Sequence, residues 1–349
     1  MGGTRVTSYQ PTRSGTAVEP GLDLVAVRPL VEQPVDAWLP LAPGDRPLVA
    51  TGDPVVPGTP LAERLRDTRV IDAPGAAGLR PGERWSPADG AAAPGRARGP
   101  EPAGELLFES GGRWRVAAGD TSETLESPVA GIVREVRPGL GIGIRAAGAG
   151  LRGAMSLGGS ARGRLEIAAG ADGELMPRGL DVGAAGTILV VGARIEAEAL
   201  TRARAMGVRG VIVAALASKE KRDFLASEAR QRAALHRLPP LAVLVLHGLV
   251  RRPISTPAML LLEALAGREV AIVGSPPRLV FDPDGIDLGP GWPDSVHVRS
   301  GPLAGQAGRW AGLAGIRRFP GGTHLRAGFV RFGEEPPIAL PLSDLERIG

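Results

Sequence analysis

Long apolar runs alternate with helix-length amphipathic segments between Gly186 and Gly274. This alternation is typical of βαβ units, in which helices cover both faces of a buried, largely parallel sheet. The sequence therefore predicts a three-layer α/β domain over residues 181–282, built on a four-stranded, mostly parallel sheet. The expected strands are 186–191, 208–215, 241–246 and 269–273, and the expected helices are 196–206, 218–236 and 257–265.

Shorter apolar segments separated by glycine and proline come before this domain and indicate β structure. Two motifs stand out among them. The first, G-D-x-V-x-x-G-x-x-L, runs from Gly52 to Leu61, and the second, S-P-x-x-G-x-V, runs from Ser127 to Val133. Their glycines permit tight turns with positive φ, and the side chain of Asp53 can accept hydrogen bonds from neighbouring amides. Val55 and Leu61 are expected to point inward from short strands.

Two segments of the N-terminal half are expected to lack a packed core. Residues 1–20 are polar and predict a flexible tail, and an alternating strand pattern follows at 22–27. In 87–104, fourteen of the eighteen residues are Pro, Gly or Ala, which predicts a disordered excursion near 75–104. A hairpin is predicted around the Gly111-Gly112 turn.

The C-terminal part carries the sharpest motif of the chain. Residues 296–308 fit V-x-V-x-x-G-P-x-x-G-x-x-G, and two further strands are expected at 327–332 and 338–340. Gly301 and Gly305 are expected to bracket a tight turn, and Gly308 to let the chain reverse. The valines of the motif are expected to face a small core.

The two N-terminal motifs together resemble the barrel-sandwich hybrid fold of biotinyl and lipoyl carrier domains. Their order is similar to that in the C subunit of Rnf-type electron-transport complexes. The resemblance covers residues 22–140 and implies the fold rather than the activity. A barrel-sandwich-like β domain is therefore predicted over residues 21–180. Carrier domains present a modified Lys, but the only lysines of this chain are Lys219 and Lys221. Neither biotin nor lipoyl attachment is therefore expected in this domain.

The C-terminal motif resembles the KOW motif, a small SH3-like β-barrel of NusG transcription factors and several ribosomal proteins. The resemblance predicts an SH3-like barrel over residues 292–349. It implies RNA, DNA or a component of the transcription or translation machinery as partner. Such barrels also serve as protein-docking modules, so a protein partner is the alternative.

The composition of the chain excludes several kinds of functional site. The 349 residues include 43% hydrophobic but only 3% aromatic residues, carry a net charge of +4 and contain no Cys. Disulfides, thiolate metal sites and cysteine nucleophiles are thereby excluded. Neither a secretory signal nor an apolar run long enough to span a bilayer is visible, which predicts a cytoplasmic protein without membrane association. The four His residues have no metal spacing, and no catalytic signature is present, so no metal or cofactor is expected.

One candidate ligand site follows from the predicted sheet, because ligands bind beyond the carboxyl ends of parallel strands. This edge would carry an anion-binding rim, and His247 could act there as a general base. Glu196 and Glu198 at the start of the first helix would repel an anion, and no nucleotide-binding loop is present. Strand-end loops with solvated charges are the favoured interpretation. The candidate rim residues are Arg194, Ser218, Lys219, His247, Arg251 and Arg252.

A second candidate site lies in the predicted C-terminal barrel. From Asp294 onward there are seven Arg and five acidic residues, a net charge of +2. The arginines could contact phosphates and an aromatic side chain could stack on a base. The alternative is that the aromatics form the core and the barrel contacts protein. The candidate residues are Arg299, Arg309, Trp310, Arg317, Arg318 and Arg326.

Fold and motifs together favour a non-catalytic adaptor that docks on a nucleic-acid or protein assembly through its KOW-like and barrel-sandwich-like domains. The alternative function is a small-molecule, anion-binding sensor or an enzyme that uses the strand-end rim of the α/β domain. A structural component of an oligomer is a third possibility.

Overall fold

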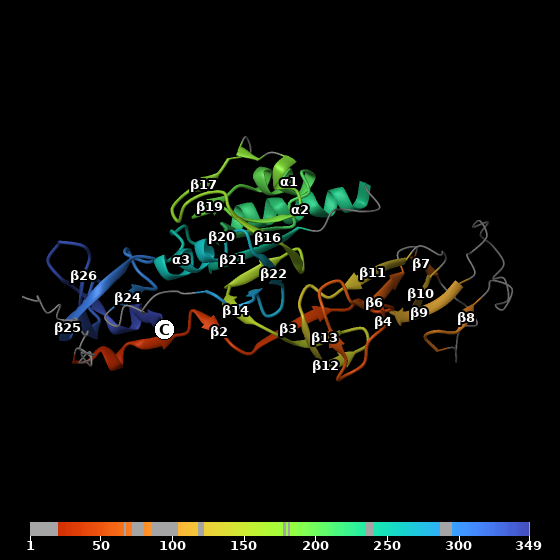
Figure 1. Ribbon diagram of the computed structural model, residues 1–349, viewed down its shortest axis with the longest axis horizontal. Coiled ribbons are helices and arrows are strands. Elements are labelled where there is room, and N and C mark those ends of the chain that lie inside the picture. Colours follow the sequence, from red (N-terminus) through yellow and green to blue (C-terminus); the bar gives the residue numbers. More distant parts are fainter. Residues whose placement is uncertain are drawn as a thin grey trace, which may run out of the picture. The chain divides into compact units, whose positions relative to one another are not determined.

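The computed structural model describes residues 20–65, 68–71, 80–85, 104–117, 122–176, 179–180, 182–234, 241–286 and 295–348. The chain divides into two compact units: Met1–Pro29 with Leu288–Gly349, and Leu30–Asp287 (Figure 1). Nearly all of the predicted tail and most of the predicted excursion near 75–104 lie outside the described residues. None of the helices in the described ranges has the length and hydropathy needed to cross a bilayer.

A nine-stranded mixed sheet forms the centre of the larger unit. β16, β18, β20 and β21 run parallel, and the pairs at either side of them are antiparallel. In spatial order the strands are β15 (Met155–Leu157), β21 (Ala242–Gly248), β20 (Gly210–Ala215), β18 (Thr187–Val190), β16 (Ala161–Ile167), β22 (Glu269–Val273), β23 (Arg278–Phe281), β14 (Ala149–Arg152) and β2 (Val31–Glu32).

The predicted four-stranded sheet was therefore too small. β16 lies between β18 and β22, and β22 runs antiparallel to it. Arg162, Arg164 and Glu166 interrupt the apolar pattern of β16, because one face of this strand is exposed while Leu165 is fully buried on the other. A strand with one solvated face does not show the continuous apolar run by which a buried parallel strand is recognised.

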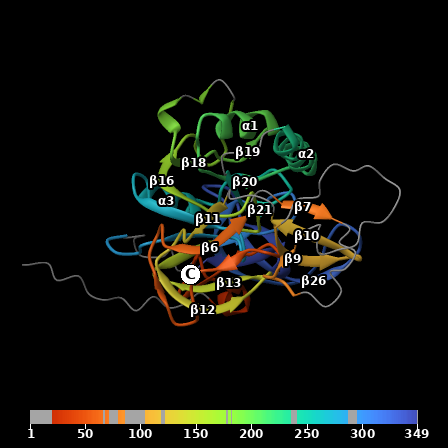
Figure 2. The same ribbon diagram turned by 90° about the vertical axis from the view of Figure 1, so that its right-hand side faces the viewer.

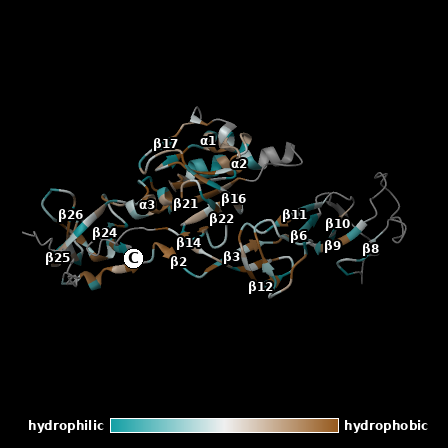
Figure 3. Cartoon of the chain, viewed as in Figure 1, coloured by the Kyte–Doolittle hydropathy of each residue, from teal (hydrophilic) through white to brown (hydrophobic). Residues whose placement is uncertain are grey.

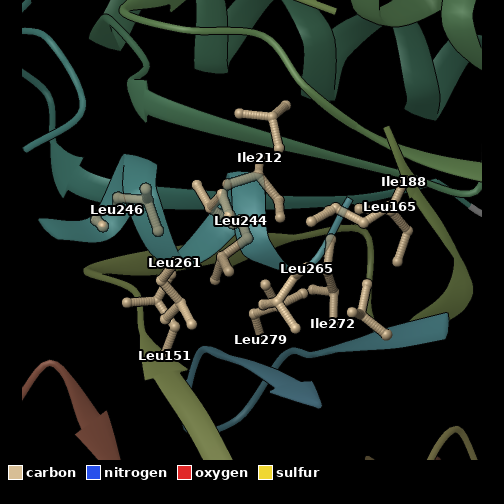
Figure 4. Packing of buried hydrophobic residues seen from close by; sticks show 14 of the residues in the cluster. Leu151, Leu165, Ile188, Ile212, Leu244, Leu246, Leu261, Leu265, Ile272 and Leu279 are labelled. Carbon is tan, nitrogen blue, oxygen red and sulfur yellow. The ribbon is translucent and has the colours of Figure 1, made fainter. Parts of the chain in front are cut away.

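Three helices cover the two faces of the sheet, as predicted. α1 (Ala197–Ala205) and α2 (Ser218–Ala234) lie on one face, and α3 (Thr256–Ala264) lies on the other (Figures 1 and 2). Side chains alternate along each strand, so that Ile188 joins the core under α3 while Leu189 joins the core under α1 and α2. Figure 4 shows the first of these cores, and Figure 3 shows the apolar strands beneath the helices.

A buried ion pair connects α1 and α2. Nη2 of Arg204 lies 3.4 Å from Oε1 of Glu228, and the two side chains are only 3% and 11% exposed. The guanidinium of Arg204 also lies 4.9 Å from the centroid of the Phe224 ring, which is fully buried. This ring and carboxylate together stabilise a cation that burial alone would disfavour.

We expect Glu228→Gln to lower the free energy of unfolding by about 3–5 kcal/mol, because it leaves the Arg204 cation buried without its counter-charge. Glu198→Gln is the matched control, since Glu198 is exposed on α1 and its replacement should change stability by less than about 0.5 kcal/mol. Urea unfolding followed by helical circular dichroism measures both variants. Equal losses for the two variants would contradict the assigned role of the ion pair.

Beside the nine-stranded sheet, the described part of the larger unit has three small antiparallel sheets and one two-stranded parallel sheet, β17 (Glu174–Leu175) with β19 (Arg194–Ile195). The predicted hairpin at Gly111-Gly112 is confirmed, because β9 (Gly104–Ser110) and β10 (Arg113–Ala117) pair across it and both glycines have positive φ. The first sheet contains β3 (Val35–Pro40), β13 (Gly141–Ala146), β12 (Gly131–Arg137) and β5 (Pro54–Val55). The second contains β11 (Ser122–Glu126), β6 (Pro60–Leu65) and β4 (Arg46–Pro47), and the third contains β7 (Thr68–Ile71), β10 (Arg113–Ala117), β9 (Gly104–Ser110) and β8 (Arg84–Trp85).

The two N-terminal motifs pair directly with each other. β5 lies antiparallel to β12, with Val55 opposite Gly131. The amide of Gly52 donates to the Val133 carbonyl at 2.8 Å, and the Ser127 amide donates to the Thr59 carbonyl at 2.9 Å. Each motif therefore satisfies backbone groups of the other.

The side chains of the first motif behave as its pattern predicts. The Ala50 amide donates to Oδ2 of Asp53 at 2.7 Å, and Val55 and Leu61 are buried. Their core also takes in Ala271 and Val273 from the nine-stranded sheet. These parts share a core and belong to one compact unit, Leu30–Asp287.

Gly131→Ala should destabilise the paired motifs by about 1–3 kcal/mol, since an added Cβ would overlap the carbonyl oxygen of Arg145. Gly170→Ala is the control, because a Cβ there meets no atom within 4 Å and the backbone φ is not positive. The thermal unfolding midpoint of the full chain is the readout. A decrease no larger for Gly131→Ala than for Gly170→Ala would show that this close approach is unimportant.

The smaller unit contains a six-stranded sheet around its own core. Leu22 and Val25, which were expected to open the preceding β domain, belong to this core. β1 (Ala26–Arg28) pairs parallel with β28 (Leu345–Ile348). A strand pattern gives no indication of a partner more than three hundred residues away. In spatial order the strands are β1 (Ala26–Arg28), β28 (Leu345–Ile348), β24 (Ser295–Val298), β25 (Ala307–Arg318), β26 (His324–Arg331) and β27 (Ile338–Pro341).

The C-terminal motif takes nearly the expected conformation. Gly301 and Gly305 have φ values of 86° and 93°, and the Gly305 amide donates to the Val298 carbonyl at 2.7 Å. Val296 and Val298 are buried in the core. Gly308 is not a reversal point, because it lies inside β25, where a Cβ would stand 2.5 Å from Cγ1 of Val330. The missing side chain of Gly308 lets Val330 pack closely against this strand.

Candidate functional sites

The loops beyond the carboxyl ends of β18, β20 and β21 are tied to one another by backbone hydrogen bonds. The Ala193 amide donates to the Gly173 carbonyl at 2.7 Å, and the Ile254 amide donates to the Ala171 carbonyl at 2.8 Å. The Leu216 amide donates to the Gly248 carbonyl at 3.0 Å. These three amides are thus already used within the protein and do not point at an anion.

Arg194 is engaged by two carboxylates of its own chain. Its Nε donates to Glu174 at 2.8 Å and its Nη2 donates to Glu196 at 2.9 Å. The hydrogen bond and charge of Glu174, followed by the charge of Glu196, raise the pKa of Arg194 above its ordinary value. The start of α1 beside it is also occupied, since the Ala197 amide donates to Oε2 of Glu220 at 2.8 Å.

His247 has a structural partner in the same way. Its Nε2 accepts a hydrogen bond from the Ser255 amide at 3.3 Å, directly before α3, and Arg252 donates to the His247 carbonyl at 3.1 Å. This nitrogen must be unprotonated to accept, and it is already engaged there rather than open as a general base. Of the candidate rim residues, Ser218, Lys219 and Arg251 are exposed, while Arg194, His247 and Arg252 contribute to the internal network.

The structure removes Trp310 from the candidate stacking residues. This side chain is 4% exposed, lies in the core, and donates its indole N–H to the Pro20 carbonyl at 3.4 Å. Gly328 permits this packing, because a Cβ there would overlap the indole ring. Arg299 follows β24, where its amide donates to the Asp344 carbonyl at 2.8 Å.

The other candidate arginines lie on the β25–β26 hairpin, and the strand register divides them between its two faces. Arg309 lies directly opposite Arg331, and Arg317 lies over the Phe329 ring at 5.8 Å on the same face. We call Arg309, Arg317 and Arg331 the arginine face. On the other face Arg318 pairs with His324, and Arg326 pairs with Ile316, which is 70% exposed.

The arginine face carries uncompensated charge. Two like charges directly opposite each other on neighbouring strands disfavour the pairing. Arg309, Arg317 and Arg331 are all exposed, and the described part of the chain places no carboxylate in an ion pair with any of them. Arg331 was not among the candidate residues, because its only signal in the sequence is its place two residues after Phe329 in an expected strand.

Two of the clefts in the described part of the larger unit are large enough to consider, and no rim residue lines either of them. The larger cleft, of about 520 Å³, lies between the turns of the N-terminal motifs and strands β22 and β23. Its polar lining includes Gln33, Arg162, Glu269, Asp282 and Asp284. The smaller cleft, of about 260 Å³, lies beside Trp38 on the exposed face of β3, β13 and β12. Sequence patterns gave no sign of either cleft, since both join segments distant along the chain.

No group of three or more His, Cys, Asp or Glu side chains that could hold a metal ion occurs within the described ranges. Comparison of the chain with protein-family models, with curated proteins and with solved structures finds no match. Assignment of function therefore depends on the side-chain geometry.

His297 is a buried titratable group within the C-terminal motif. It is 3% exposed, and neither ring nitrogen has a hydrogen-bond partner in the described structure. Burial lowers the pKa of His297 from its ordinary value of 6.5 to about 4. The folded protein therefore favours the neutral imidazole of His297 over the protonated one.

Stability should fall as the pH decreases from about 6.5 to about 4, because the unfolded chain binds a proton at His297 that the folded chain does not. Within that window His297 changes the free energy of unfolding by up to about 1.4 kcal/mol per pH unit. Above the window it makes no pH-dependent contribution. His297→Leu should lose this component while retaining the carboxylate titrations. Thermal unfolding of both proteins at several pH values tests this, and parallel pH profiles would contradict it.

Proposed function

We propose that this chain is a non-catalytic adaptor that docks on nucleic acid through the arginine face of β25 and β26. The observation that supports this most is the direct pairing of Arg309 with Arg331, with Arg317 on the same face. Guanidinium groups on one strand face without a carboxylate partner are suited to phosphates, which accept bidentate hydrogen bonds from arginine. Phosphate contacts position a protein on nucleic acid without reading its sequence.

The resemblance of the 296–308 motif to the KOW motif supports the same proposal. Gly301 and Gly305 have the positive φ that the motif predicts for its turn, and Val296 and Val298 are buried, as the motif also predicts. The exposed aromatic residue expected for base stacking is not Trp310, which is core, so binding in this unit should depend mainly on phosphates. A component of the transcription or translation machinery is the proposed setting.

The geometry gives less support to the alternative, an anion sensor or enzyme at the strand-end rim. Glu220 occupies the amide at the start of α1, and Arg194 is neutralised by two carboxylates. An anion would have to displace these groups before binding. The paired arginines on β25 and β26 need no such displacement.

The double variant Arg309→Ala/Arg331→Ala should weaken binding to labelled RNA and DNA and reduce the slope of log K against log salt by about 1.5, since each phosphate contact contributes about 0.7–0.9. The matched control, Arg202→Ala/Arg209→Ala, removes the same charge from exposed positions of the larger unit. Fluorescence anisotropy across a salt series measures both.

Equal slopes for the two double variants would contradict docking through the arginine face. Absence of binding by the wild-type chain at low salt would overturn nucleic acid as the partner. In that case capture of a protein that depends on Arg309 and Arg331 would support the protein-docking alternative instead.

A further inference from the structure

Trp38 lies on a floor made by two glycines. It is half-buried on the outer face of the sheet formed by β3, β13 and β12, directly opposite Gly143. A Cβ on Gly141 would overlap the indole ring, and one on Gly143 would stand 3.4 Å from its Cε3. The Gly-Ile-Gly sequence of β13 thus lets the ring lie along the strand, and Ile142 points the other way into the core.

A cleft of about 260 Å³ lies against this ring. Its polar walls come from Asp36, Arg134, Glu135 and Arg145, and Pro276 contributes an apolar side. All of these residues belong to the larger unit. The cleft therefore combines a planar aromatic surface with charged groups within a single compact unit.

Arg134 reaches the cleft because of a β-bulge. The register of β12 against β13 skips from Val133 to Glu135, so that Arg134 is the extra residue and has no cross-strand partner. Bulges redirect side chains in this manner and occur often beside binding sites. Arg134 is exposed and, among the described residues, takes part in no ion pair.

The remaining charges beside the cleft compensate one another. Nε of Arg145 donates to Asp36 at 2.5 Å, and Nε of Arg137 donates to Glu135 at 2.5 Å. The guanidinium of Arg137 lies over the Trp38 ring, 6.0 Å from its centroid, so a base that stacks on the indole would have to move this guanidinium aside. The cleft thus combines a half-buried indole, covered in part by the Arg137–Glu135 pair, with one cation that has no carboxylate partner, Arg134.

We propose that this cleft binds a nucleotide unit, with the base stacked against the Trp38 indole and its phosphate at Arg134. Stacking on an aromatic ring together with a nearby guanidinium is the combination used for unpaired bases, whose faces are accessible. A duplex keeps its bases stacked on one another, so the site is selective for single strands or free nucleotides. The site lies in a different unit from the arginine face and does not depend on it.

The test uses the full chain and a short single-stranded DNA that contains 2-aminopurine, whose fluorescence is quenched by stacking. Trp38→Ala should weaken binding about tenfold, in the range of one lost base stack, and abolish the quenching. Trp38→Phe should retain part of both, which separates stacking from a folding defect. Arg134→Ala should weaken binding and lower the salt slope by about 0.7, whereas Arg209→Ala should change neither.

Adenosine monophosphate as competitor distinguishes the two sources of the ligand. Displacement of the strand by the mononucleotide in the wild type assigns the cleft to free nucleotides, and its failure assigns the cleft to single strands. Each series is repeated in the Arg309→Ala/Arg331→Ala background, where the effects of Trp38 and Arg134 should persist. Wild-type binding and quenching in Trp38→Ala and Arg134→Ala would overturn the site and leave docking through the arginine face intact.

Discussion

Burial of the parallel strands on both faces is the constraint on which the larger unit depends. Every residue of β18 and β20 is buried, so the chain must supply helices on each side to exclude water. With only 3% aromatic residues, these cores consist mainly of Val, Leu, Ile and Ala. The connecting loops then meet at the carboxyl edge, where their polar groups need partners. Glu220 and His247 provide them, so the usual ligand edge of such a sheet is used to hold α1 and α3.

The candidate binding surfaces consequently lie on exposed β faces. A strand face in contact with water tolerates arginine without a carboxylate partner, because solvent screens the charge. Arg309 and Arg331 illustrate this on β25 and β26, and Arg134 does so at a bulge of β12. Both surfaces combine guanidinium groups with a partly buried ring, Phe329 in one unit and Trp38 in the other. The two surfaces would recognise different features, the phosphate backbone and the unpaired base.

Sequence patterns predicted local structure well and distant pairing poorly. The apolar runs of β18, β20 and β21 and the turn glycines Gly301 and Gly305 depend on neighbours in the chain, and these predictions are confirmed. The parallel pairing of β1 with β28 and the insertion of β16 beside β22 depend on contacts between distant segments. The candidate sites divide in the same way. Arginine-rich strands are visible in the sequence. The strand register is not, because β25 contains bulges, and this register decides that Arg309 lies opposite Arg331 and that Trp310 points into the core.

Photo-crosslinking of the full chain to single-stranded and double-stranded nucleic acid, with mass-spectrometric mapping of the crosslinked peptides, tests docking through exposed β faces most directly. Crosslinks should fall on peptides that contain β25 and β26 with either ligand, and on the peptide of Trp38 with the single strand alone. Crosslinks confined to the strand-end loops around Arg194, Lys219 and Arg251 would contradict this account and place the binding site at the rim of the sheet.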